Sequence, residues 1–352
     1  MPRTERHESA RGAAAESFLL LFTLKTMSLS SPTHQPEILS GPFGSLLNDL
    51  HGISTREAFS SKHFEQIRSA LHAYRVAGVT QPVTPTFGAA ARGVNGGRFS
   101  QELEEWNQLA AQFTHEVFPG REPLGSIAPL LDTSGTDDAA WSAKTNRSDA
   151  ARRIHLPQLQ ALRDAGIGGA LAEAVHDFDE ATGIVNAAAD AGMQRVIVSF
   201  EPTERGLPNN AIDIQSYDEV ASRLHDIARG RIQACIGMNC GNADQIIDLL
   251  SASKPGTFAA VYPNHSIIPH NETGARFREL ADLNHERTDS QELEFDGLRR
   301  LFQISDAQLQ RLSELGGELG VRYLGLCCGS GPHDVRELAA RVRIATPADA
   351  LQ

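Results

Sequence analysis

Four cysteines are the residues of this sequence whose type and spacing could hold a metal ion: Cys235, Cys240, Cys327 and Cys328. Adjacent cysteines rarely form a structural disulfide, because neighbouring Cβ atoms reach the required geometry only under strain. Three thiolates suit zinc, and a fourth open position is typical of a catalytic zinc site rather than a structural one. The spacing alone fits buried, inert cysteines equally well, because it contains no Cys-x-x-Cys pair.

Alternating strands and helices must position these cysteines. Short apolar runs predict eight strands: Ile38–Leu39, Val79–Val83, Gly125–Leu130, Gly168–Leu171, Arg195–Phe200, Ile232–Met238, Phe258–Tyr262 and Arg322–Leu326. Segments with helical spacing follow them: His63–Ala77, Gln101–Phe118, Ala150–Ala165, Asp179–Ala191, Ser216–Ala228, Ala243–Ala252, Asp306–Leu319 and His333–Arg343. This alternation indicates a parallel sheet.

We expect an α/β fold, a single-domain (β/α)8 TIM barrel, with a doubly wound open sheet as the alternative. The barrel is favoured because the glycine pattern of a dinucleotide-binding open sheet is absent after the first predicted strand. In a barrel, the sixth and eighth strands end on the same face, where Cys240, Cys327 and Cys328 could converge. Cys235 lies inside the sixth strand and is predicted to be a buried, inert thiol.

Two long polar segments, Asp132–Asn146 and Pro263–Ser290, follow the third and seventh predicted strands. A barrel carries its functional loops at this end of its strands. We expect the barrel to span residues 37–345, after a disordered N-terminal extension over residues 1–36 and before a C-terminal tail over residues 346–352.

Composition limits the class of protein. Hydrophobic residues make up 41% of the 352 residues, enough for a sizeable core. The net charge of −12 disfavours nucleic acid and anionic membranes as partners. The apolar stretch Phe18–Phe22 is too short for a membrane span or a secretory signal. Few cysteines and free thiols fit a reducing compartment, so we expect a cytoplasmic protein. The sequence gives no signal of oligomeric state.

The cysteine segments resemble those of a known family. Gly325-Leu-Cys-Cys-Gly-Ser-Gly-Pro-His333 resembles the paired-cysteine signature of the homocysteine S-methyltransferase family, and Gly237-Met-Asn-Cys240 resembles its Asn-Cys motif. Further segments are similar to that family in the same order: Leu39–Ser45, Thr84–Phe87, Gly125–Pro129, Gly169–Glu173, Val198–Phe200 and Val261–Asn264. The resemblance runs from residue 37 to about residue 342.

The resemblance implies a barrel that binds one zinc ion through Cys240, Cys327 and Cys328. It also implies methyl transfer to homocysteine, giving methionine, from a sulfonium co-substrate such as S-methylmethionine or S-adenosylmethionine. The chemistry is consistent with the ligands, because a zinc-bound thiol is deprotonated and remains nucleophilic. We therefore expect a zinc-dependent S-methyltransferase whose partners are a small-molecule thiol and a methyl donor.

The same resemblance implies residues that bind substrate. Glu173 matches the acidic residue that binds the amino group of homocysteine, although a carboxylate stabilised by the following helix dipole is an alternative. Asn239, next to a ligand, could orient the loop or touch substrate, and Ser40 and Gly41 lie in the loop that helps to hold the amino group. Four more residues are expected to line the site: Phe87, Ser126, Tyr262 and Asn264. His333 is not placed on the metal.

Several positions depart from the family pattern. Ser40 stands where an aspartate is usual, and Pro42 replaces a glycine and fixes φ. Leu326 replaces a glycine beside the cysteine pair. Gly88 stands where betaine-using members carry a tyrosine, which disfavours betaine as the donor. The alternatives are therefore the same chemistry on another small thiol or selenol, a non-catalytic zinc-binding or sensor barrel, and a metal-free barrel with buried cysteines.

Overall fold

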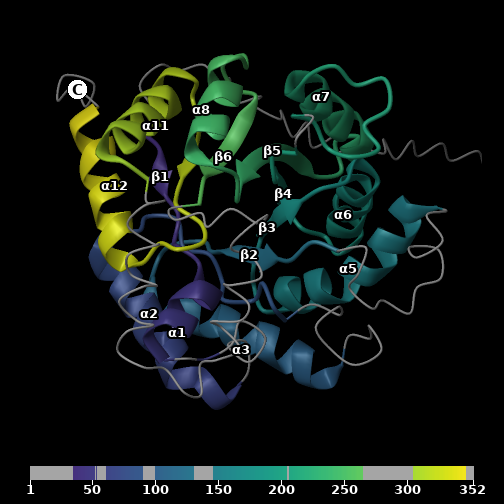
Figure 1. Cartoon of the computed structure of the whole chain (residues 1–352). Coiled ribbons are helices and arrows are strands. Elements are labelled where there is room, and N and C mark those ends of the chain that lie inside the picture. The colour runs from purple at the N-terminus through teal and green to yellow at the C-terminus, as the bar shows by residue number, and fades with distance from the viewer. Residues whose placement is uncertain are drawn as a thin grey trace, which may run out of the picture.

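A curled sheet of seven parallel strands forms the centre of the protein (Figure 1). The computed structural model describes residues 35–51, 53, 61–89, 100–130, 146–203, 206–264 and 304–345. The strands are β1 (Glu37–Ile38), β2 (Leu124–Ile127), β3 (Gly169–Val175), β4 (Arg195–Phe200), β5 (Gln233–Asn239), β6 (Phe258–Tyr262) and β7 (Tyr323–Leu324). They lie in the order β1-β7-β6-β5-β4-β3-β2, so β6 separates the two strands that precede the cysteines.

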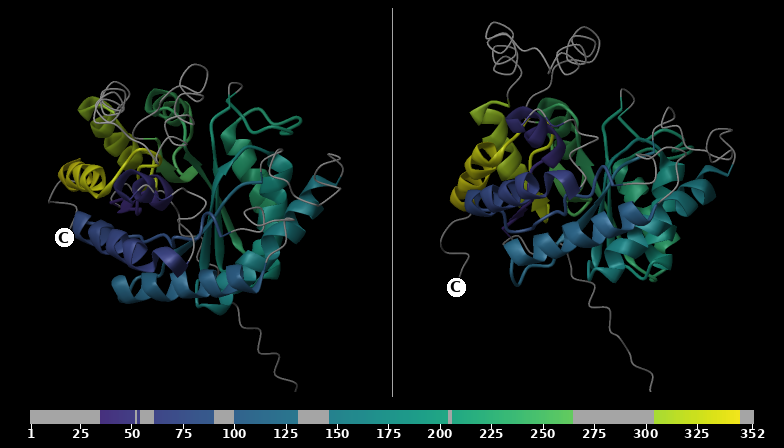
Figure 2. Two further views of the ribbon diagram at one scale, coloured as in Figure 1. Left: turned by 60° about the horizontal axis from the view of Figure 1, so that its bottom comes forward. Right: turned by 90° about the horizontal axis from the view of Figure 1, so that it is seen from below.

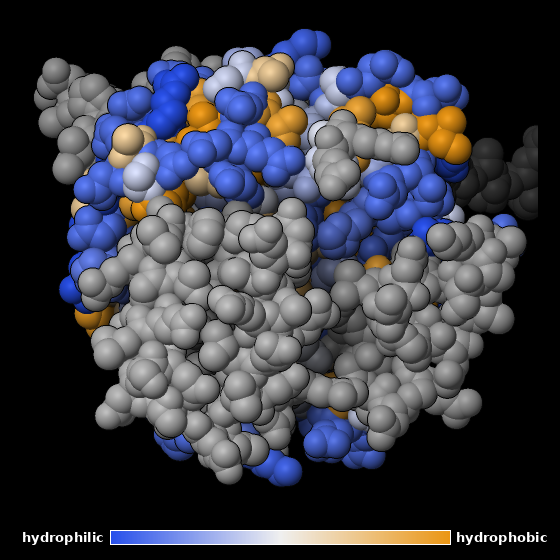
Figure 3. All heavy atoms as spheres, viewed as in Figure 1, coloured by the Kyte–Doolittle hydropathy of each residue, from blue (hydrophilic) through white to orange (hydrophobic). Residues whose placement is uncertain are grey.

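Helices stand around the outside of this sheet in both views of Figure 2. They are α1 (Phe43–His51), the short 3-10 helix η1 (Ser61–His63), α2 (Phe64–Ala77), α3 (Gln101–Val117), α5 (Arg147–Asp164), α6 (Phe178–Asp190), α7 (Tyr217–Ala228), α8 (Ala243–Ser251), α11 (Asp306–Glu318) and α12 (Pro332–Ala345). No described helix has the length and apolar character that a membrane crossing requires. Hydrophilic residues dominate the described surface on the face in Figure 3.

The predicted second strand, Val79–Val83, is not a strand of the sheet. The prediction of a closed eight-stranded barrel is therefore wrong for this strand, and the sheet has seven strands. The segment makes only isolated parallel bridges, which join Leu39 with Gln81 and Val83 with Leu124. Pro82 and Pro85 explain the difference, because proline has no backbone N–H to donate to a continuous ladder.

The same segment nevertheless lies between the two edges of the sheet. The backbone N–H of Gln81 donates to the Ile38 carbonyl over 2.9 Å, and the N–H of Leu124 donates to the Pro82 carbonyl over 2.9 Å. The edge strands β1 and β2 are therefore each joined to this segment by two backbone hydrogen bonds rather than by an eighth full strand. Helix α1 was also absent from the sequence prediction, because Gly41, Pro42 and Gly44 are residues typical of a turn.

Alternating side chains divide the core into two layers. The inner face of the curled sheet gathers Leu39, Val83, Leu124, Leu171, Ile197, Ala260, Tyr262, Tyr323 and Cys327. The outer face packs against the helices, as Val196, Val198 and Phe200 of β4 do. Because Ile197 lies on the inner face, the alternation also directs Ser199 and the next residue in phase, Glu201, inward.

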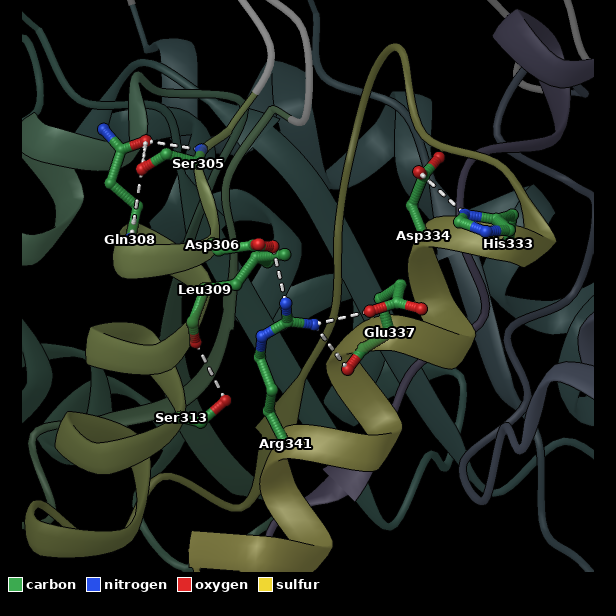
Figure 4. A network of polar contacts seen from close by, with 9 residues as sticks. All are labelled: Ser305, Asp306, Gln308, Leu309, Ser313, His333, Asp334, Glu337 and Arg341. Carbon is green, nitrogen blue, oxygen red and sulfur yellow. Dashed lines mark hydrogen bonds and ion pairs between the residues drawn. The ribbon is translucent and has the colours of Figure 1, made fainter.

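Polar contacts fix the last helix, which begins directly after the cysteine pair. Figure 4 shows Arg341 of α12 reaching Asp306 of α11 and Glu337 of its own helix. The nitrogen–oxygen distances are 2.5 Å to Asp306 and 2.9 Å to Glu337. At the other end of α12, the Asp334 carboxylate accepts the backbone N–H of Gly331 over 2.8 Å. These contacts restrict the turn that carries the two cysteines.

Helices α5 and α6 pack closely at Gly183. A Cβ atom at this position would lie 2.5 Å from the Cβ of Ala151 and 2.5 Å from the carbonyl oxygen of Ser148. We expect Gly183→Ala to lower the free energy of unfolding by about 1–3 kcal/mol, because the two helices must separate. Urea denaturation followed by circular dichroism measures the change.

Gly317→Ala is the matched control. This glycine is also helical, in α11, but a Cβ atom there would meet nothing within 4 Å. Alanine has the higher helix propensity, so the control should gain up to about 1 kcal/mol of stability. Equal effects of the two substitutions would contradict the tight packing at Gly183.

Candidate metal centre

Three cysteine sulfurs converge at the carboxyl ends of β5 and β7. Cys240 follows β5, and Cys327 and Cys328 lie in the turn between β7 and α12. The Cys240 and Cys327 sulfurs are 2.9 Å apart, and those of Cys327 and Cys328 are 4.0 Å apart. All three lie within 4.8 Å of one another, and no other group of three or more potential ligands occurs among the described residues.

The three thiols fit a tetrahedral zinc ion. Zinc–sulfur bonds of about 2.3 Å in a tetrahedron place the sulfurs about 3.8 Å apart. The 4.0 Å between Cys327 and Cys328 matches this spacing, and the Cys240–Cys327 pair at 2.9 Å would have to widen. All four cysteines of the chain are free thiols. The donor set is therefore of the soft type that zinc prefers.

The backbone at Cys240 is held in an uncommon conformation. Its φ of 59° lies in the left-handed region, which costs a residue with a Cβ atom about 1–2 kcal/mol. The Cys240 N–H donates to the Tyr262 carbonyl over 3.4 Å, so the turn is fixed to the end of β6. Strain of this kind persists where neighbouring contacts determine the backbone, and it is frequent at functional sites.

Asn264, at the end of β6, joins the two cysteine loops. Its Nδ2 donates to the Cys240 carbonyl over 2.6 Å, and its Oδ1 accepts the N–H of Cys328 over 3.1 Å. Its own backbone N–H donates to the Gly241 carbonyl over 3.1 Å. One amide side chain therefore bonds to both cysteine loops, in addition to the backbone hydrogen bonds that fix Cys240 to Tyr262 and Cys327 to Pro263.

Asn239, the last residue of β5, lies beneath the sulfurs and is completely buried. Its Oδ1 accepts the N–H of Ala174 over 2.9 Å. This bond directs its Nδ2 toward the Cys240 sulfur, at 3.1 Å, and toward the Cys327 sulfur, at 4.0 Å. An N–H aimed at sulfur favours the thiolate form, so Asn239 supports the ligands electrostatically.

The pKa values of the three thiols differ. Hydrogen bonds from Cys240 and Cys327 hold the pKa of Cys328 well below its usual value. The pKa of Cys240 is well above its usual value, because its hydrogen bonds to Cys327 and Cys328 and its burial favour the protonated form. The pKa of Cys327 is also raised, because its contact with Cys328 and its burial outweigh the hydrogen bond with Cys240. A bound cation is required to hold all three as thiolates together.

Two carboxyl groups face the same end of the sheet. Ser126 donates a hydrogen bond to the Glu173 carboxylate, but burial raises the pKa of Glu173 to about 7, with a smaller contribution from the Cys328 thiolate. Burial and the Cys328 thiolate also raise the pKa of Glu201 to about 7. His176 Nε2 lies 3.3 Å from the Glu201 carboxylate. Both carboxyls therefore lie in the field of the sulfur cluster.

The hydroxyl groups of Ser199 and Tyr262 lie buried and close together on the inner face, and neither has another hydrogen-bond partner among the described residues. Burial raises the pKa of Tyr262 well above its usual value, and the Glu173 carboxylate adds to this effect. The Ser199 hydroxyl acts in the opposite direction on this pKa, and hydroxyls that have only each other as partners keep hydrogen-bonding capacity for a ligand. The segment Val198–Phe200 resembles the family, but no role was predicted for Ser199 from the sequence; its alternation with Ile197 places it on the inner face.

The remaining predicted residues have packing contacts in this structure. Ser40 is buried and its Oγ accepts the N–H of Val83 over 2.9 Å, which ties the end of β1 to the bridging segment. A Cβ atom at Gly41 would lie 2.7 Å from the Tyr74 hydroxyl, so this glycine allows a close approach. Phe87 packs, partly buried, against the outer core. Binding roles for these three residues stay predictions.

The other sequence predictions near the site have different outcomes. The His333 side chain is 81% exposed, and its Nδ1 lies 3.7 Å from the Asp334 carboxylate. Figure 4 draws this pair at the start of α12. The loop over Asp132–Asn146 lies outside the described residues except at its end, and Pro263–Ser290 is described only over its first two residues. Residues 1–34 and 346–352 also lie outside the described part.

Comparison with known proteins gives a family and a fold. The sequence model of the family described as homocysteine S-methyltransferase matches residues 35–342. The metallated form of the homocysteine methyltransferase MmuM from Escherichia coli superposes with a TM-score of 0.60 at 17% identity, covering 88% of this chain and 96% of that chain. Its apo form gives 0.57 at 16% identity, with the same coverage. No curated protein sequence is significantly similar.

The bridging role of Asn264 yields a prediction about metal affinity. Asn264→Ala removes the side-chain hydrogen bonds to both cysteine loops and leaves their backbone bonds to the end of β6, and we expect the zinc dissociation constant to rise about 10–100-fold. Competition with a chromogenic chelator measures this constant. The control is Asn186→Ala, because Asn186 accepts an Arg231 hydrogen bond over 2.7 Å on the outer helix α6. Unchanged zinc affinity in Asn264→Ala would show that the two loops hold their positions without it.

Proposed function

The chain belongs to the homocysteine S-methyltransferase family, and we propose that it transfers a methyl group from a sulfonium donor to zinc-bound homocysteine. The family makes it a methyltransferase; the donor class and the single zinc ion are the proposed parts. One observation carries the proposal: the sulfurs of Cys240, Cys327 and Cys328 lie within 4.8 Å of one another at the strand ends. Zinc, when bound, supplies the charge that keeps an acceptor thiol deprotonated while leaving it nucleophilic.

Other residues of the site position the cysteines and bind the acceptor. Asn239 directs its amide N–H at two sulfurs, and Asn264 holds the two cysteine loops together. Glu173, oriented by the Ser126 hydroxyl, is suited to bind the ammonium group of the acceptor. An ammonium placed beside this buried carboxyl would stabilise its ionised form, which burial disfavours. The hydroxyls of Ser199 and Tyr262 could bind the other polar groups of the acceptor.

The reaction itself is an in-line displacement. The acceptor thiolate attacks the methyl carbon, a new carbon–sulfur bond forms, and the bond from the methyl carbon to the donor sulfur breaks. The bonding pair stays on the donor sulfur, which becomes a neutral thioether. The contribution of the protein is alignment, because holding both substrates in one geometry removes much of the entropic barrier.

A second candidate keeps this chemistry and uses another small thiol or selenol as the acceptor. Ser40 favours it, because this side chain replaces an acidic residue and its Oγ already accepts a backbone hydrogen bond from Val83. Assays of methionine formation from homocysteine, and of methylation of other small thiols, separate the two candidates. A non-catalytic barrel would bind zinc and ligand but give no methylated product.

The first test removes one zinc ligand. We expect Cys240→Ala to lose stoichiometric zinc and to form methionine at least about 100-fold more slowly, because the acceptor thiol is no longer activated. Zinc is measured by elemental analysis, and methionine by chromatography after incubation with homocysteine and each sulfonium donor. Cys235→Ala is the control, since Cys235 lies within β5, the strand that Cys240 follows, but outside the three-sulfur group. Product from metal-free Cys240→Ala at the wild-type rate would refute the proposal.

The second test concerns the acceptor. Glu173→Gln keeps the shape and the contact with Ser126 but removes the charge. We expect the KM for homocysteine to rise about tenfold or more, since hydrogen bonds to charged groups contribute about 1.5–3 kcal/mol. Zinc content and the KM for the donor should stay the same. An unchanged KM for homocysteine would assign Glu173 to packing alone.

A further inference from the structure

A histidine and a glutamate meet beside the sulfur cluster and have no role in the chemistry described so far. His176 follows β3 and Glu201 follows β4, and their side chains lie 3.3 Å apart at 35% and 32% exposure. The Glu201 N–H donates to the Val175 carbonyl over 3.1 Å, so the backbone holds the pair at the junction of the two strands. The backbone on which the pair stands is therefore held by the sheet, and both side chains are partly exposed and accessible to a ligand.

The sheet register gives the height of this pair. Three residues paired in register mark one level across β3, β4 and β5: Val175, Phe200 and Met238. His176, Glu201 and Asn239 are the next residues along each strand, and Cys240 follows directly. Glu173 comes two residues before the marked level, at about 3.3 Å of rise per residue. Measured along the strand direction, Glu201 therefore lies close to the level of the sulfurs. Glu173 lies further from the carboxyl ends of the strands.

The Glu201 carboxylate has no cationic residue of the Lys or Arg type as a partner among the described residues. His176 contacts one oxygen, Oε2, and the described part of the chain provides no hydrogen bond to Oε1. The nearby Cys328 thiolate adds negative charge to its surroundings. A carboxylate in such surroundings attracts a cation. Because strand alternation places the Glu201 side chain on the inner face, a cation bound to it would lie on the same side of the sheet as the sulfurs.

We propose that Glu201, positioned by His176, binds the sulfonium group of the methyl donor. The inference rests on the proposed function, because in-line transfer requires the donor sulfur to lie near the acceptor sulfur and hence near the zinc ligands. A sulfonium has no N–H to donate, so a partly exposed carboxylate would recognise it through charge rather than through hydrogen bonds. The deeper Glu173 is left for the ammonium group of the acceptor.

This assignment has a consequence for the exchange of product for substrate. Methyl transfer turns the sulfonium into a neutral thioether, so the attraction to Glu201 exists for the donor and disappears for its product. The donor is then bound more tightly than the spent thioether, which favours product exchange. Charge on the donor falls in the transition state, so loss of Glu201 should raise the KM for the donor more than it lowers kcat.

The test uses two ligands that differ in this charge, S-methylmethionine and methionine. Calorimetry on the zinc-loaded protein, without acceptor and hence without turnover, compares their dissociation constants. We expect the wild type to bind S-methylmethionine about tenfold more tightly than methionine, a difference of about 1.4 kcal/mol. Glu201→Gln should reduce this preference to less than about twofold. His176→Ala should weaken the preference, and His176→Gln, which keeps a hydrogen-bond donor, should restore it.

Glu37→Gln is the matched control. Glu37 is a partly buried glutamate that lies 3.7 Å from Arg322, at the start of β1 and hence at the opposite end of the strands. The control should keep the full preference for S-methylmethionine. Wild-type protein without such a preference, an unchanged preference in Glu201→Gln, or an equal loss in Glu37→Gln would overturn the inference.

The outcome is separable from that of the proposed function. If the wild type forms no methionine but shows a preference that depends on Glu201, the inference stands and the methyl-transfer proposal fails. If methionine forms and the preference does not depend on Glu201, the methyl-transfer proposal stands and the inference fails.

Discussion

The side chain of Asn264 lies between the two halves of the metal centre, and the arrangement of the site depends on it. Strand β6 separates β5 from β7, so cysteines that follow those two strands are not neighbours in the sheet. Asn264 follows β6 and bonds the Cys240 carbonyl on one side and the Cys328 N–H on the other. The parallel order of three strands and one amide therefore bring together three sulfurs from distant parts of the sequence.

The inner face of the sheet explains how so many polar groups reach one place. Alternation along each strand puts Glu173, Ser199 and Glu201 on the same side as the apolar inner residues, and the sulfurs close the upper end. Burial raises the pKa values of the two carboxyls, and the Cys328 thiolate raises them further. Near pH 7 both carboxyls are therefore only partly ionised, and a nearby cation would favour their charged forms. Zinc, an ammonium and a sulfonium are each the type of group that such surroundings bind.

Much of this could be predicted from the sequence, and the exceptions have physical causes. Seven of the eight predicted strands occur, and the places of the cysteines after two apolar runs made their convergence possible, while the resemblance to the family identified them as ligands. The prediction of a strand over Val79–Val83 was wrong. Its residues favour a strand, but Pro82 and Pro85 have no backbone N–H to donate to a hydrogen-bond ladder. His176 and Glu201 were not predicted, since their meeting depends on the register of β3 with β4. The hydrogen bond from Val83 to Ser40 depends likewise on a contact between distant segments.

The most direct measurement of the central claim is X-ray absorption at the zinc edge of the zinc-loaded protein, recorded before and after homocysteine is added. The account predicts three protein sulfurs around zinc and a fourth sulfur when homocysteine binds. A first coordination shell that contains fewer than three sulfurs, or one that homocysteine leaves unchanged, would contradict it.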